Sequence, residues 1–452
     1  MQIRQIAILA FLVGFSGCQF ARQSGGNSGR IEIGPNVRVS QDGDFPHVET
    51  TIASDPSNPD RMIVTATAAH FEKEDAPNSR CGMRIYYSAD GGQSWKRAEV
   101  PALADIQGCN ARVAFGPEGR GYFTTIEYRG TVQRIYTSDD GGASWAPTLD
   151  AGQRGDKPDL LVDTTAGPHR GTMYVLINLG NAYAVAASSD GGKSWTHTMM
   201  APGPNEPPMT RMLEGTTIMQ DGTVGLLYRE FRQRPDKWWD LDMRFCAFDA
   251  GGKKHGEPFV ICTRPCIQYQ EPQPGAVVGT GNSAIGMASV VREPKTGRLV
   301  TVWNDWYPGA GNDLYWSYSD DQGKNWTPGQ RLVPDAPAGS HRYQSCLAVN
   351  QEGVIGVFFL DTRAHANAGA FDGYFAASFD GGRSFKTPRR VTTAPSTPRE
   401  YKKGFDWTRY IGGGDYLQMV VDAQGDFHPV WPDARHGGIQ QIYTCTIRAE
   451  RN

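Results

Sequence analysis

Arginine and carboxylate side chains recur at the ends of this chain's predicted strands, and together they could act on an anionic sugar. An arginine fork binds a substrate carboxylate through two hydrogen bonds, while acids and a tyrosine serve proton transfer or nucleophilic attack. At the starts of first strands stand His47, Arg112, Asp159, Glu214, Arg342 with Tyr343, and Arg409 with Asp415. Just after second strands stand His70, Glu127, Arg229, Asp305, Asp361 with Arg363, and Asp433 with Arg435.

A short repeated string indicates the elements that must position these residues. It reads SADGGQSW at 88–95, SDDGGASW at 138–145, SSDGGKSW at 188–195, SDDQGKNW at 319–326 and SFDGGRSF at 378–385, with a worn copy at 248–252. Asp caps a turn by accepting backbone N–H bonds, Gly permits positive φ, and the aromatic ring packs between sheets. A calcium loop is excluded because the alternating acidic ligands and a closing Glu are absent.

Between these strings a second pattern recurs, an apolar strand, a short turn and another apolar strand. It begins at residues 48, 111, 159, 214, 287, 345 and 416. Each unit then adds a third strand, the string and a fourth strand, and such units bury both faces when they surround an axis. We therefore expect an all-β β-propeller of four-stranded blades, seven in number, with six as the alternative. The segment NVRVS at 36–40 should close the ring by pairing with the last third strand at 440–447.

The geometry of a propeller predicts which face carries the candidate functional residues. Connections between fourth and first strands, and between second and third strands, share one face, and the repeated strings point to the other. The arginines and acids above should therefore gather opposite the strings. The formal net charge of −3 gives no argument for nucleic acid as a partner. We expect no metal or other cofactor, a monomer, and an acidic glycan or glycoconjugate as the partner.

The N-terminus carries an export signal. Arg4 precedes an apolar run at 6–15 that is too short to span a bilayer and ends before Cys18. This resembles a bacterial lipoprotein signal, in which the cysteine becomes lipidated, with a plain secretory signal as the alternative. We expect a signal peptide at 1–18, a flexible tether at 19–29 and one propeller domain at 30–452. The protein would be an exported, membrane-anchored lipoprotein, periplasmic or at the cell surface.

The repeated string matches the Asp box of the sialidase (neuraminidase) superfamily, and one segment is similar to the active site of that family. In residues 214–229 (EGTTIMQDGTVGLLYR), the resemblance implies that Glu214 acts as base toward a tyrosine nucleophile and that Arg229 holds the substrate carboxylate. Tyr343, in YQSCL, is the nearest match to the family tyrosine, one residue out of register. A bulge would be needed to turn it to the correct face.

Arg363 in DTR and Arg435 in DAR occupy matching positions of two repeats. Such a match favours a structural role, in which an Asp-Arg pair fixes a loop, over a role in ligand binding. Both arginines nevertheless remain candidates for the substrate-binding set. His47 and His70 flank the two inner strands of the first unit and could converge on the mouth of the propeller.

Three functions are compatible with these residues. The first is a sialidase-type glycoside hydrolase, with Glu214, Tyr343 and the proton donor Asp305 as catalytic residues and Arg229, Arg112 and Arg363 around the carboxylate. The second is a polysaccharide lyase that uses His47, His70 and a tyrosine such as Tyr128 on a uronate glycan. The third is a non-catalytic propeller whose rim binds glycans or a partner protein.

Overall fold

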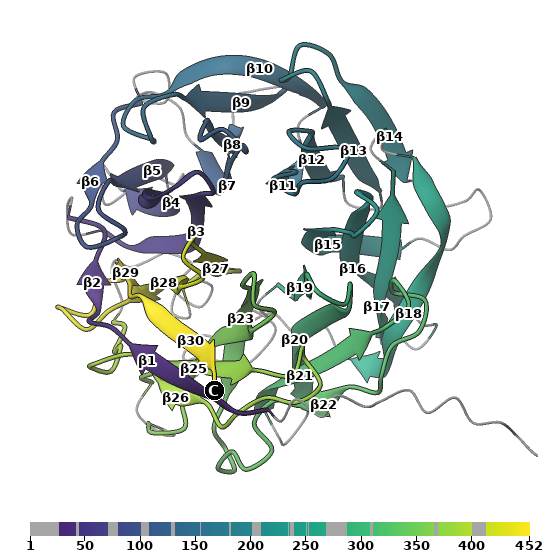
Figure 1. Cartoon of the computed structure of the whole chain (residues 1–452). Helices are drawn as coiled ribbons and strands as arrows, with labels where there is room; N and C mark the ends of the chain where they lie inside the picture. Colours follow the sequence, from purple (N-terminus) through teal and green to yellow (C-terminus); the bar gives the residue numbers. More distant parts are fainter. Residues whose placement is uncertain are drawn as a thin grey trace, which may run out of the picture.

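Seven β-sheets surround a central axis, each with its strands stacked outward from that axis (Figure 1). The computed structural model describes residues 27–41, 45–70, 80–100, 108–127, 132–153, 155–179, 182–200, 209–233, 235, 239–249, 251, 253–267, 287–307, 311–365, 369–399 and 413–452. This confirms the all-β propeller with seven blades. The described residues contain no helix long and apolar enough to span a bilayer.

Six blades are four-stranded antiparallel sheets in chain order. They are β3(His47–Asp55), β4(Asn58–His70), β5(Arg80–Ser88) and β6(Lys96–Arg97); β7(Gly108–Phe115), β8(Gly121–Glu127), β9(Val132–Ser138) and β10(Ala146–Gln153); β11(Asp156–Val162), β12(Met173–Asn178), β13(Tyr183–Ser188) and β14(Thr196–Met200); β15(Met209–Ile218), β16(Val224–Gln233), β17(Trp239–Phe248) and β18(Lys254–Ile267); β19(Ser289–Arg292), β20(Leu299–Tyr307), β21(Gly311–Ser319) and β22(Gln330–Arg331); and β23(Arg342–Val349), β24(Ile355–Asp361), β25(Asp372–Ser378) and β26(Arg389–Arg390). The first strand of each blade lies nearest the axis (Figure 1).

The two ends of the chain build the seventh blade together. Strands β27(Gln418–Val421), β28(Phe427–Asp433) and β29(Gln441–Thr444) come from the C-terminal part, and β2(Val37–Arg38) pairs with β29. The predicted closure at 36–40 is thereby confirmed. A second closure was not predicted, in which β1(Gly29–Ile33) pairs with the last strand, β30(Ile447–Arg451), over five residues.

The apolar core lies between neighbouring blades. The cluster between the sixth and seventh blades contains Trp431, Phe358 and Phe375, all fully buried. Equivalent clusters fill the other interfaces, with Tyr183 of the third blade packed edge-on against Tyr228 of the fourth at 5.4 Å. Because alternate residues of each inner strand face opposite blades, the blades hold one another in place and fix the inner strands around the axis.

The repeated strings form the hairpins between third and fourth strands, as predicted. In the first, the Ser94 N–H donates to Asp90 Oδ1 at 2.9 Å, the Ser88 hydroxyl donates to the same oxygen at 2.8 Å, and Trp95 Nε1 donates to the Gly92 carbonyl. The two bonds to the aspartate recur around Asp140, Asp190, Asp321 and Asp380. The tryptophan bond recurs at Trp145 and Trp326. The worn copy keeps part of the pattern, because Asp249 accepts the N–H groups of Gly251 and Lys253.

These carboxylates should make the fold sensitive to acid. Hydrogen bonds from Ser194 lower the pKa of Asp190 to about 2, and similar bonds lower the pKa of Asp90 against the opposing effect of burial. A lowered folded pKa contributes stability above the unfolded value of about 3.9 that disappears as pH falls through the folded pKa. We expect the melting temperature to drop between about pH 5 and pH 2. The melting temperature of Asp190→Asn should lie below that of the wild type at neutral pH, and this difference should become smaller as pH falls. A difference that does not change with pH would contradict the stabilising role of the ionised Asp190 carboxylate.

Candidate active site at the axial channel

The first strands of all seven blades enclose a channel of about 490 Å³ along the axis. Its wall includes Thr51, Arg112, Asp159, Glu214, Cys346 and Tyr416. Each first strand enters the blade at the face opposite the Asp boxes, since the boxes follow the third strands. Polar residues at the start of these strands therefore meet at that end of the channel.

Backbone bulges aim a ring of side chains at this end. Glu49, Asn110, Lys157 and Gln344 have φ values of 56°, 54°, 46° and 47°, and register breaks of β3, β7, β11 and β23 enclose them. Counting back from the turns gives one equivalent position in all seven first strands (49 before 55, 157 before 163, 344 before 350). We call this set the axial ring; its members are Glu49, Asn110, Lys157, Glu214, Met287, Gln344 and Tyr416. Left-handed backbone at non-glycine residues costs about 1–3 kcal/mol each, and such strain concentrates at functional sites.

Glu214 sits in a further bulge of β15 and is almost fully buried. Its Oε2 lies 3.3 Å from Arg229 Nη2 and accepts the Ala288 N–H at 2.6 Å. Burial raises the pKa of the Glu214 carboxyl, and neither Arg229 nor the Ala288 N–H cancels that effect. The structure thus places Glu214 and Arg229 side by side, and the raised pKa lets the carboxyl hold a proton above its ordinary range.

Lys157 and Asp415 place a second ion pair at the same end of the channel. Lys157 Nζ lies 3.1 Å from Asp415 Oδ2, and both residues act electrostatically on Glu214. Lys157 belongs to the third blade, Glu214 to the fourth, and Asp415 precedes the seventh. The pair therefore crosses the axis and connects the site of Glu214 to the strand that carries Tyr416.

Arg112 and Tyr416 form the third part of the site. The Arg112 guanidinium lies 3.8 Å from the centre of the Tyr416 ring, and Arg112 Nε lies 3.4 Å from Asp159. The Tyr416 hydroxyl donates to Asn110 Oδ1 at 3.3 Å. Burial raises the pKa of this hydroxyl well above its ordinary value, which Arg112 opposes and Glu49 reinforces. Asp159 also accepts the Thr216 hydroxyl at 2.5 Å, two residues from Glu214.

The arrangement can bind an anion and transfer a proton. Arg112 lines the channel, Arg229 pairs with the channel residue Glu214, and Lys157 acts electrostatically on Glu214, so three blades each supply one cation on or beside the channel wall. Glu214 offers an acid with a raised pKa, and Tyr416 offers a hydroxyl beneath a guanidinium. Carboxyl groups with raised pKa values are the usual proton donors of glycoside cleavage.

The structure does not bring Tyr343 or Asp305 to this site. Tyr343 is fully buried between blades against Phe371, and its hydroxyl has no hydrogen-bond partner among the described residues. The required bulge is present, between Tyr343 and Cys346, but it directs Ser345 and Cys346 to the channel and Tyr343 to the core. Asp305 lies in β20 opposite Asp313 and does not line the channel. The expectation that Tyr343 reaches the site is therefore wrong, and Tyr416 is the tyrosine that lines the channel.

Arg363 and Arg435 are held by the aspartates of their own motifs. Arg363 Nε donates to Asp361 at 2.8 Å, and its guanidinium lies 4.2 Å from the Tyr374 ring. Arg435 Nη2 donates to Asp433 at 2.7 Å and to Asn36 at 3.0 Å. Neither arginine lines the channel, and their contacts fit the loop-pinning role.

His47 is a buried structural histidine in the observed arrangement. Its Nε2 lies 2.9 Å from the Tyr86 hydroxyl and its Nδ1 lies 3.0 Å from the Phe45 carbonyl oxygen. It is fully buried and does not line the channel. The side chain of His70, all of Tyr128 and Cys18 lie outside the described residues.

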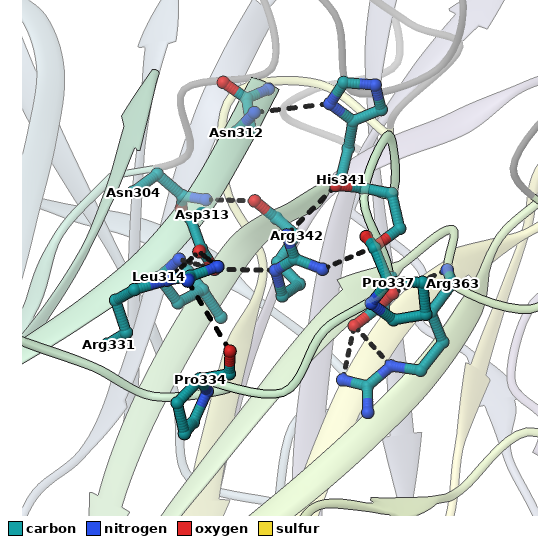
Figure 2. A network of polar contacts seen from close by, with 12 residues as sticks. Asn304, Asn312, Asp313, Leu314, Arg331, Pro334, Pro337, His341, Arg342 and Arg363 are labelled. Atoms are coloured by element: carbon teal, nitrogen blue, oxygen red, sulfur yellow. Dashed lines mark hydrogen bonds and ion pairs between the residues drawn. The ribbon is translucent and has the colours of Figure 1, made fainter. Parts of the chain in front are cut away.

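The start of the sixth blade carries another polar network, built around Asp313 (Figure 2). Asp313 Oδ1 accepts Arg342 Nε at 2.6 Å, and its Oδ2 accepts Arg331 Nε at 2.6 Å. Arg342 also donates to Ser340, and its carbonyl accepts the Asn304 amide at 2.9 Å. Burial and Arg342 lower the pKa of the neighbouring His341. Because Arg342 is engaged on all sides, this network joins the fifth and sixth blades and leaves no fork for a substrate.

Reasoning from sequence missed Lys157 and Tyr416 as functional residues. Each occupies the axial-ring position of its strand, and the signal that could have found them is the recurrence of a polar or aromatic residue at one fixed distance before six of the seven first turns. A second cavity, of about 540 Å³, lies at the Asp-box face and is lined by Arg61, Arg120 and Arg170. Asp139 pairs with Arg120 there. The described residues contain no cluster of three or more metal-ligating side chains.

Comparisons with known proteins agree with this architecture. The BNR/Asp-box repeat family matches residues 86–97 and 317–328. No curated protein sequence matches the chain. A protein of unknown function from Dyadobacter fermentans is 13% identical over 93% of this chain and 99% of its own, with a TM-score of 0.51. An ulvan lyase, described as a new family of polysaccharide lyase, is 11% identical over 93% of this chain and 94% of its own, with a TM-score of 0.50.

A Hadza microbial sialidase is 14% identical over 86% of this chain and 76% of its own, with a TM-score of 0.42. At these identities the likeness concerns the fold alone. The repeat match and the geometry of the hairpins together establish the architecture of the chain. The chain is an Asp-box (BNR-repeat) β-propeller, as its resemblance to the sialidase superfamily predicted.

Proposed function

We propose that this protein is an exported, lipid-anchored glycoside hydrolase of the sialidase type that removes a terminal acidic sugar at the axial ring. One observation carries the proposal. A carboxylic acid with a raised pKa, a tyrosine and Arg112 line a single channel, and two further cations from other blades, Arg229 and Lys157, act on that acid.

The cations would select the substrate. Arg112 and Arg229 present guanidinium groups that suit the planar carboxylate of an acidic sugar, and Lys157 adds a compact charge. In the free protein these groups are paired with Asp159, Glu214 and Asp415. A substrate carboxylate would compete with those partners, which favours anionic over neutral sugars.

Glu214 and Tyr416 would perform the chemistry. Protonated Glu214 would donate its proton to the leaving glycosidic oxygen, while the Tyr416 hydroxyl would attack the anomeric carbon and lose its proton to a base. Water, activated by deprotonated Glu214, would then cleave the bond between the sugar and Tyr416, which releases the sugar and restores both side chains. Glu49 is the carboxylate that acts electrostatically on Tyr416. The sequence analysis expected Glu214 to act as a base. The proposal gives it the role of the acid, because the pKa of its carboxyl is raised.

The lyase alternative has less support because its histidine is occupied. His47 is buried, does not line the channel and has partners at both ring nitrogens, which counts against it as the base that takes a proton from a uronate. The ulvan lyase resembles this chain in fold only. A lyase would reveal itself by the ultraviolet absorbance of a newly formed unsaturated uronate.

The proposal is tested with a fluorogenic N-acetylneuraminic acid glycoside and a tyrosine pair. Wild type and Tyr343→Phe should release the fluorophore at similar rates, since the Tyr343 hydroxyl lies in the core. Tyr416→Phe should lower kcat by about 10²-fold or more, because the attacking oxygen is removed. Equal activity of the two variants would remove Tyr416 from the mechanism. No release from any acidic glycoside would remove the hydrolase.

A further inference from the structure

The first described residue of the chain is fastened to the Asp-box face. Asn27 Oδ1 accepts the Phe379 N–H at 2.8 Å, and Asn27 Nδ2 donates to the Ser384 hydroxyl at 2.8 Å. Both partners belong to the Asp-box hairpin of the sixth blade, at 378–385. Gly29 packs so closely on Phe379 that a Cβ at that position would overlap the ring.

From this point the chain runs toward the opposite face. Strand β1 pairs with β30, and the following Asn36 contacts Thr393 and Arg435, the latter in the connection that follows β28. The chain then passes Ser40, which bonds Gln441, and enters β3 at His47 beside the axial ring. The N-terminal segment therefore reaches the propeller at the Asp-box face and climbs the seventh blade to the channel mouth.

The connection to the proposed lipid is short. Residues 19–26 separate Cys18 from Asn27, and a chain of that length reaches about 30 Å when fully extended. The height of the blade at β28(Phe427–Asp433) is roughly 23 Å, to which the loops of both faces add. Turning the channel mouth to the membrane would use nearly the whole extended length, whereas the Asp-box face can approach the bilayer at any extension.

We propose that the Asp-box face lies toward the phospholipid bilayer and that the axial ring opens away from it. The orientation rests on the lipid anchor of the proposed function, and it is independent of the chemistry at Glu214. It implies that the substrate is presented from the side away from the anchoring membrane. A free or polymer-bound glycan fits this geometry, and a glycolipid headgroup in the same membrane does not.

The orientation is tested with lipidated protein on phosphatidylcholine vesicles that contain a nitroxide-headgroup lipid. A genetically encoded fluorescent amino acid is placed at position 193, in an exposed Asp-box hairpin, or at position 436, exposed in the connection that follows β28. Quenching should be several-fold stronger at position 193. Insertion of a long Gly/Ser segment between residues 25 and 26 should reduce the difference, because the chain could then reach either face.

Equal quenching at both positions, or stronger quenching at position 436, would overturn the orientation. Cys18→Ser should leave the vesicles; if it stays bound like the wild type, the anchor is wrong and the orientation falls with it. Glycoside hydrolysis is measured on the same preparations without vesicles. That assay reports failure of the catalytic proposal separately, since neither probe position belongs to the axial ring.

Discussion

Glu214→Gln should lower kcat for an N-acetylneuraminic acid glycoside by about 10²- to 10⁴-fold, the usual contribution of a positioned proton donor. Glutamine keeps the size of the side chain and an oxygen that can accept the Ala288 N–H, but it cannot deliver a proton. It also leaves Arg229, which is buried, without its counter-charge. KM should change less than kcat if the acid function is the main loss.

The pH profile separates catalysis from folding. Because the pKa of Glu214 is raised, its protonated form persists at higher pH than an ordinary glutamate, and activity should fall as pH rises through that pKa. In Glu214→Gln, this decline of activity with rising pH should be absent. Glu352→Gln is the matched control, since Glu352 is exposed on the Asp-box face and pairs with Lys295. Comparable activity of Glu214→Gln and wild type, with both folded by circular dichroism, would contradict the assignment.

The largest expected effect on stability comes from Asp313→Asn. Asp313 neutralises Arg342, whose side chain is 2% exposed, and also binds Arg331 (Figure 2). Removing one partner of a buried ion pair costs about 3–5 kcal/mol, because the other charge stays buried without compensation. We expect the free energy of unfolding, measured by denaturant titration, to fall by that amount.

Asp139→Asn provides the comparison. Asp139 also accepts two bonds from an arginine, Arg120, but its side chain is 72% exposed. An exposed pair contributes less than about 1 kcal/mol. The double variant Asp313→Asn with Arg342→Met should recover part of the loss, since it removes the unpaired cation. Similar losses from Asp313→Asn and Asp139→Asn would show that burial does not govern the Asp313 network.

The blades could be predicted because their signals are local. Apolar alternation, turn residues and the Asp-box string each lie within a few residues, and their repetition located every blade, including the one whose string is worn at 248–252. The β2 closure followed from counting strands. The pairing of β1 with β30 could not be predicted in this way, because neither strand carries a repeat signal and the two strands lie at opposite ends of the chain.

The site was only partly predictable because bulges and contacts between blades decide it. Glu214 and Arg229 share one hairpin, so their meeting followed from strand pairing. Tyr343 was misplaced because a bulge shifts which residues face the channel, and alternation does not reveal where an extra residue is absorbed. The pairing of Lys157 with Asp415 joins the third blade to the start of the seventh, which no local pattern encodes.

The β1–β30 pairing also determines how the domain bears mechanical load. A pull on the N-terminal chain enters at Gly29, while β30 is held by the blade at its other end, Ile447, which pairs with Phe427. The five residue pairs between the strands are then loaded in shear, all at once, and do not open one after another like a zipper. Force that enters through the N-terminal chain would therefore be resisted at the β1–β30 pairing before it could separate the blades that enclose the channel.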